Sequence, residues 1–122
     1  MTDLAGWRSA VESALTTAGV RTADSWEGEP PYAVMFFDGS SGPQLHDGSR
    51  TVDLAIVGVV SKALDDVSMT AVDGLVEDIY GALLDTPGVR INGIDSLTRN
   101  AVGVDTMYTV TFRISAMTEL GG

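Results

Sequence analysis

Residues 51–61 are the segment that most constrains the fold of this 122-residue chain. The segment is rich in β-branched residues, and its apolar side chains fall on both sides of an extended strand: Val52, Leu54 and Ile56 on one side, Val57 and Val59 on the other. A strand that is apolar on both sides is usually covered on both faces. We therefore expect this strand to lie between two covering layers.

Two other segments have the apolar spacing of amphipathic helices. The first begins at Thr2 or Asp3 and ends at Gly19, which we expect to adopt a left-handed C-cap with Val20 folding back. Its apolar stripe consists of Leu4, Trp7, Val11, Ala14, Leu15 and Ala18. The second begins at Ser68 or Thr70 and ends before Thr86-Pro87-Gly88. Its stripe consists of Met69, Val72, Leu75, Val76, Ile79, Leu83 and Leu84.

Three more strands are expected, at residues 32–37, 89–97 (with Gly93 as a bulge) and 107–115. In the last of these, the inward side is expected to carry Tyr108, Val110, Phe112 and Ile114, and the outward side Met107, Thr109, Thr111 and Arg113. The remaining segments are expected to be loops at 21–31 and 99–105, a protruding arm at about 38–50, and a frayed tail at 116–122.

The elements then follow the order α-β-β-α-β-β within a single domain, 1–122. This order predicts an α+β fold: a four-stranded, mainly antiparallel sheet with two helices on one face. Two helices cover only one face of such a sheet. A neighbouring subunit is the simplest cover for the apolar residues on the other face.

The composition excludes several kinds of chemistry. There is no cysteine, so disulfides, thiolate metal sites and cysteine nucleophiles are absent. His46 is the only histidine, and no G-x-S-x-G elbow accompanies it. The segment from Asp38 to Ser49 starts like a calcium loop but lacks the glutamate required at its twelfth position. We therefore expect no enzyme activity, no metal and no cofactor.

The charge balance is acidic, with 17 Asp and Glu against 7 Lys and Arg, for a net charge of −10. The six arginines are scattered, so specific binding to duplex DNA is not expected, although DNA could pass such a surface without sticking. The longest apolar run, 54–60, is far too short for a membrane-spanning helix. With no signal-like start, we expect the protein to be made in a cytoplasm.

The layout resembles the tail terminator proteins of long-tailed bacteriophages, especially those of actinobacterial hosts. The resemblance spans nearly the whole chain and is carried by a proline-led strand (PPYAVMFF), the long apolar strand (TVDLAIVGVVSKALDD), the second helix (MTAVDGLVEDIYGALLDTPGV) and a closing strand (YTVTFRISA). It implies a hexameric ring in the virion that caps the tail tube, ends its polymerisation and joins the tail to the connector protein of the head. DNA would pass through the lumen of the ring.

The resemblance supplies no catalytic residues, and it implies contacts through strand edges and extended loops. By position, the candidate contact residues are Trp26, Asp38, Ser40, Gln44, His46, Asp47, Arg50, Arg99, Asn100 and Arg113. Trp26 is included because an aromatic side chain in a polar loop is a reasonable interface anchor.

Two alternatives remain open. The same kind of α+β module would serve as a neck or head-completion protein or as a minor tail protein. A different class, a small ferredoxin-like dimer that binds or converts a ligand, would line a pocket with Trp26, Tyr32, Tyr80 or Tyr108.

Overall fold

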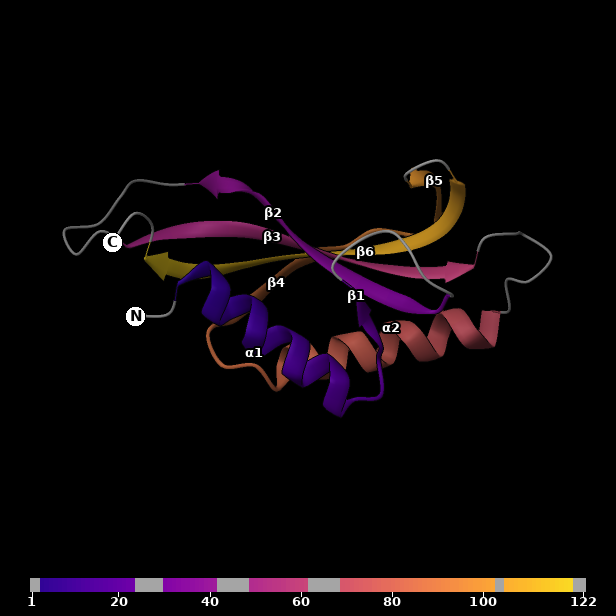
Figure 1. Ribbon diagram of the computed structural model, residues 1–122, viewed down its shortest axis with the longest axis horizontal. Coiled ribbons are helices and arrows are strands. Elements are labelled where there is room, and N and C mark those ends of the chain that lie inside the picture. Colours follow the sequence, from indigo (N-terminus) through magenta and orange to yellow (C-terminus); the bar gives the residue numbers. More distant parts are fainter. Residues whose placement is uncertain (1–2, 24–29, 42–48, 62–68, 103–104, 120–122) are drawn as a thin grey trace.

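The computed structural model describes residues 3–23, 30–41, 49–61, 69–102 and 105–119. Two helices, α1 (Leu4–Thr17) and α2 (Met69–Leu84), lie side by side on one face of a sheet (Figure 1). The strands are β1 (Thr22–Ala23), β2 (Tyr32–Ser41), β3 (Ser49–Ser61), β4 (Val89–Ile94), β5 (Thr98–Val102) and β6 (Asp105–Glu119).

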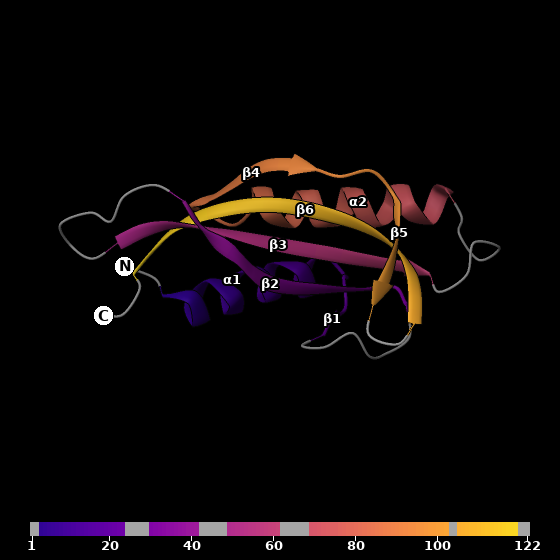
Figure 2. The ribbon, with the colours of Figure 1, turned by 90° about the horizontal axis from the view of Figure 1, so that it is seen from above.

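The sheet has six strands, in the order β1-β2-β3-β6-β4, and β5 pairs with the first part of β6. The β1–β2 pairing is parallel, and the other four described pairings are antiparallel. Figure 2 shows β4 along one side of the sheet and β1 and β2 along the other. The prediction of four strands in the order α-β-β-α-β-β is therefore wrong, because Thr22–Ala23 and Thr98–Val102 also pair as strands.

The ends of α1 follow from local chemistry. The Asp3 carboxylate accepts a hydrogen bond from the Gly6 amide at 2.8 Å, which satisfies one of the free donors of the first turn. At the other end Gly19 has a φ of +88°, and the Val20 amide donates to the Leu15 carbonyl at 2.9 Å. The predicted cap and the predicted fold-back of Val20 are both confirmed.

The main core lies between the helices and the sheet. Val52, Leu54 and Ile56 of β3 lie there beside Phe112 and Ile114 of β6, as their alternation predicted. Gly58 lets α2 come close to β3, since a Cβ at this position would lie 3.1 Å from side-chain carbons of Leu75 and Ile79. The apolar stripe of α1 packs against this layer, as does that of α2 except at its two ends. The prediction is wrong for Met69 and Leu84, which are 62 % and 64 % exposed.

A second apolar cluster lies on the opposite face of the sheet. It consists of Tyr32, Val34, Val57, Val59 and Met107, all buried within the single chain. The Tyr32 hydroxyl donates to the Met107 sulfur at 3.6 Å. The expected outward side of β6 is therefore wrong at Met107 and Thr109, which are each 1 % exposed. These residues do not need a neighbouring subunit to cover them.

Several predicted boundaries are also wrong. β2 continues to Ser41 and β3 begins at Ser49, so both ends of the expected 38–50 arm are strand, and its centre lies outside the described residues. Residues 99–102, expected in a loop, belong to β5. The tail expected to fray from Ala116 is instead part of β6 as far as Glu119. Each of these segments is held by strand pairing: β2 with β3 and β5 with β6 are neighbours along the chain, whereas the tail of β6 pairs with the distant start of β3.

Trp7 joins three parts of the fold. Its indole Nε1 donates to the Met117 carbonyl of β6 at 3.0 Å. Its ring also lies against Gly88, in the turn after α2, where a Cβ would stand 2.7 Å from Cη2. Gly88 has a φ of +87°, so both its backbone and its surroundings favour glycine. Trp7 thus fixes α1 against the turn from α2 into β4.

Replacement of Gly88 by alanine should therefore destabilise the protein. We expect Gly88→Ala to lower the free energy of unfolding by roughly 2–4 kcal/mol, from the left-handed backbone and the overpacking against Trp7. The matched control is Gly74→Ala within α2, where a Cβ meets nothing within 4 Å and should stabilise the helix by about 0.5–1 kcal/mol. Urea unfolding of both variants measures the difference, and equal effects would contradict this account of Trp7.

Candidate assembly surface

The described residues contain no group of three His, Asp or Glu side chains placed to hold a metal ion. No helix among them is long and apolar enough to cross a membrane. The candidate surface for function consists of the exposed strand edges and the side chains along them.

The outer edge of β2 is covered over its first half only. β1 pairs with Ala33 and Val34, and the Ala33 amide donates to the Arg21 carbonyl at 2.8 Å. The next outward carbonyl, that of Met35, accepts a hydrogen bond from Arg8 Nη1 at 2.7 Å. Past Met35, no described strand lies beside this edge. Among the described residues this part of β2 is therefore a sheet edge from Phe37 onward, and an edge strand is a template for another strand.

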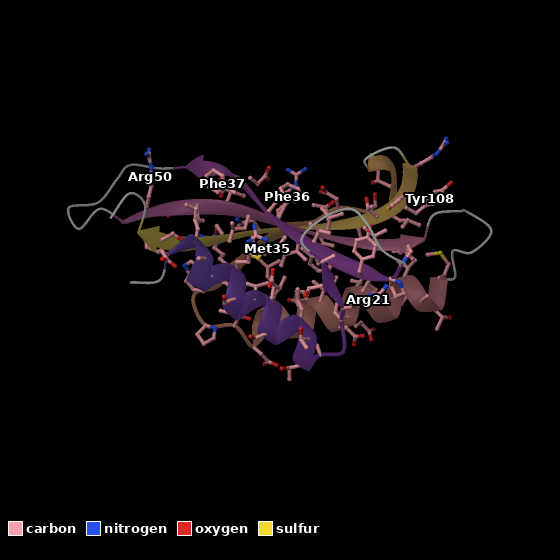
Figure 3. The ribbon with its side chains drawn as sticks, in the orientation of Figure 1. Arg21, Met35, Phe36, Phe37, Arg50 and Tyr108 are labelled. Carbon is pink, nitrogen blue, oxygen red and sulfur yellow. The ribbon has the colours of Figure 1, made fainter. Side chains whose placement is uncertain are left out.

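Phe37 stands at the start of this open stretch (Figure 3). Its side chain is 49 % exposed, although its partner across the strand pair, Leu54, is buried in the main core. The register of β2 against β3 then shifts between Phe37 and Ser40, and Gly39 takes a φ of +110° within this bulge. The bulge lets β2 continue through a run of turn-forming residues.

The opposite edge of the sheet is β4. It pairs with β6 alone among the described strands, and it also contains a register shift, between Ile91 and Gly93. Val89 and Ile91 pack toward the helices, so Arg90 between them points to the other face, where it is exposed. The open part of β2 and the edge of β4 therefore each carry a bulge and a charge, as is usual for edges kept from indiscriminate pairing.

An exposed ion pair lies on the face away from the helices. Arg113 of β6 contacts Asp95, with Nη2 and Oδ2 3.1 Å apart. The two side chains are 62 % and 45 % exposed, so solvent screens this pair and its contribution to stability is small. Its effect is to fix the direction of the Arg113 side chain on this face.

The predicted contact residues do not form one cluster. Arg50 pairs in register with Thr118 and Arg99 with Tyr108, so they lie about ten residues apart along β6, roughly 33 Å. Figure 3 shows Arg50 and Tyr108 at opposite ends of the sheet. The other predicted residues have the following positions: Asp38 is exposed on β2, Ser40 and Asn100 lie in β2 and β5, and Trp26, Gln44, His46 and Asp47 lie outside the described residues.

Sequence reasoning missed Phe37 and Arg90 as surface candidates. In the sequence, Phe37 has the pattern of an ordinary strand residue. Only the turn-forming pair Asp38-Gly39 after it indicates that the buried part of the strand ends there. Arg90 had a usable signal, since it alternates with Val89 and Ile91 and so points away from the core.

No protein-family model matches the chain, and no curated protein sequence matches it either.

If Phe37 is a surface residue, replacing it should hardly affect folding. We expect Phe37→Ser to lower the free energy of unfolding by at most about 1 kcal/mol, because half of its side chain is already in water. The contrasting variant is Met35→Ala on the same strand, which should cost roughly 2–5 kcal/mol since Met35 is buried. Chemical denaturation measures both, and a Phe37→Ser cost as large as that of Met35→Ala would show that Phe37 belongs to the core.

Proposed function

We propose that this protein is a structural component of a bacteriophage virion, a tail terminator that forms a hexameric ring on the end of the tail tube. In this role it ends polymerisation of the tube and joins the tail to the connector protein of the head. DNA passes through the lumen of the ring without specific binding.

The observation that carries the proposal is the pair of open edges on opposite sides of one sheet. β2 past Met35 has no described strand on its side away from β3, and β4 has none on its side away from β6. β3 and β6 lie between these two edges. Contacts between two different surfaces of identical subunits repeat from copy to copy, and they close into a ring when the rotation per copy is right. A sheet open on both sides is suited to that arrangement.

Two further features support the same role. The net charge of −10 gives a surface that does not hold DNA, which a lumen for DNA passage requires. The resemblance of the element order and strand sequences to tail terminators supports the specific position in the virion.

The ligand-binding alternative is less well supported. Tyr32, one of its pocket candidates, is 1 % exposed and packed against Met107 on the face away from the helices. Tyr80 is exposed on α2, which covers the other face (Figure 1). These two tyrosines therefore do not line one cavity.

The test uses the purified chain and tubes of the major tail protein encoded in the same genome. We expect elongation to stop once about six copies are present per tube end, with a ring at that end in electron micrographs. In a control reaction, from which the protein has been removed after unfolding, the tubes should continue to grow. A stable dimer that leaves tube length unchanged would refute the proposal.

A further inference from the structure

Two cross-strand rows run from the open edge of β2 to the open edge of β4. On the helix face the row is Phe37, Leu54, Ile114 and Ile91, each in register with the next. In the adjacent row on the other face, the bulge places Asp38 and Gly39 opposite Asp53, which is followed by Ser115 and Arg90. Each row begins on β2 and ends on β4 at the same level along the strands.

The ends of these rows are chemically complementary. Phe37 and Ile91 are apolar and lie on the helix face, whereas Asp38 and Arg90 carry opposite charges and lie on the other. Asp38 and Arg90 are both exposed, and neither has an ion-pair partner within the described part of the chain. Two strands separate them, a spacing of roughly 14 Å, so they cannot pair within one molecule.

We propose that β2 of one copy docks through Phe37 and Asp38 on β4 of the next copy, with Phe37 against Ile91 and Asp38 against Arg90. This joint rests on the ring of the proposed function and names the surfaces that build it. β2 and β4 run in opposite directions in the sheet, so copies placed side by side in the same orientation meet as antiparallel strands.

The level rows favour a closed ring. If Asp38 meets Arg90 of the next copy, passing from one copy to the next requires no step along the strands. A heterologous contact without such a step can close into a ring when the rotation per copy divides the circle evenly, whereas one with a step produces an open helical filament. The open part of β2 is short because β1 and Arg8 close its first half, so this contact adds few backbone hydrogen bonds.

Charge also favours a β2–β4 contact between copies over a symmetric β2–β2 or β4–β4 contact. A symmetric β2–β2 contact centred on Asp38 would bring Asp38 against Asp38, and a symmetric β4–β4 contact centred on Arg90 would bring Arg90 against Arg90. Like charges directly opposite each other destabilise a strand pair, whereas opposite charges stabilise it. With a net charge of −10 on every copy, an exposed arginine on one edge favours pairing with the acidic edge of another copy.

The absence of cysteine permits a direct test. Single variants Asp38→Cys and Arg90→Cys are prepared, mixed in equal amounts and oxidised, both alone at high concentration and on tail tubes. Directly opposite residues in antiparallel strands have Cβ atoms close enough for a disulfide. We expect the mixture to form covalent dimers about tenfold faster than either single variant alone, because the joint holds the two thiols together.

The matched control replaces Asp38→Cys with Asp78→Cys, an exposed acid on α2, mixed with Arg90→Cys. This mixture should react no faster than thiols free in solution.

Charge reversal gives a second readout. Asp38→Arg and Arg90→Asp should each abolish rings on tubes, because each places like charges opposite each other. An equal mixture of the two variants should restore the rings, with copies of the two variants alternating around each ring. Unfolding curves of these surface variants should match that of the parent chain.

The outcomes separate the joint from the function. Rings on tubes without the Asp38–Arg90 cross-link would overturn the joint and leave the tail terminator proposal standing. A specific cross-link with no effect on tube length would uphold the joint and refute that function. A cross-link in Asp38→Cys alone, as fast as in the mixture, would show a symmetric β2–β2 contact and overturn the joint.

Discussion

The pairing of β3 on both of its edges is the constraint on which the rest of the structure depends. β2 follows one edge from Tyr32 to Ser41, and β6 follows the other from Tyr108 to Glu119. Because β3 is apolar on both faces, the helices bury one side and the Tyr32–Met107 cluster fills the other. Gly58 lets α2 lie close against this central strand. With the centre occupied in this way, the open edges are those of β2 and β4.

The sequence predicted what is determined locally. The helices were found because their apolar spacing, the Asp3 cap and the Gly19 C-cap are written into neighbouring residues. The strand count was wrong because β1 has only two residues and depends on Arg21 meeting Ala33. β5 was missed for a similar reason, since Thr98–Val102 has no period-2 pattern and exists through pairing with β6. Tertiary pairing overrode local preference in both segments.

The site was predicted less well than the fold. The argument that a neighbour must cover the free face treated the sheet as a flat surface, whereas Tyr32, Val57 and Met107 cover one another within the chain. Asp38 was among the predicted contact residues, but the role proposed for it depends on the bulge that carries β2 through a run of turn formers. The strand resumes after that bulge because β3, the next strand along the chain, pairs Val52 with Ser40 and Thr51 with Ser41. No short-range signal in the residues 38–41 predicts such pairing.

The bulges and charges that limit strand pairing at the two edges also give the proposed joint its selectivity. A bulge and a charge on each of β2 and β4 shorten the stretch that a foreign strand could use. The two charges differ in sign, so the same devices that oppose symmetric pairing favour β2 against β4. Arg8 and β1 limit the proposed contact to the end of β2, and such a short contact would leave single copies apart at low concentration. In the proposed function, a tube end that holds several copies at once would remove that barrier, because neighbouring copies would meet at a high effective concentration. Assembly would in this way be confined to the place where the ring is needed.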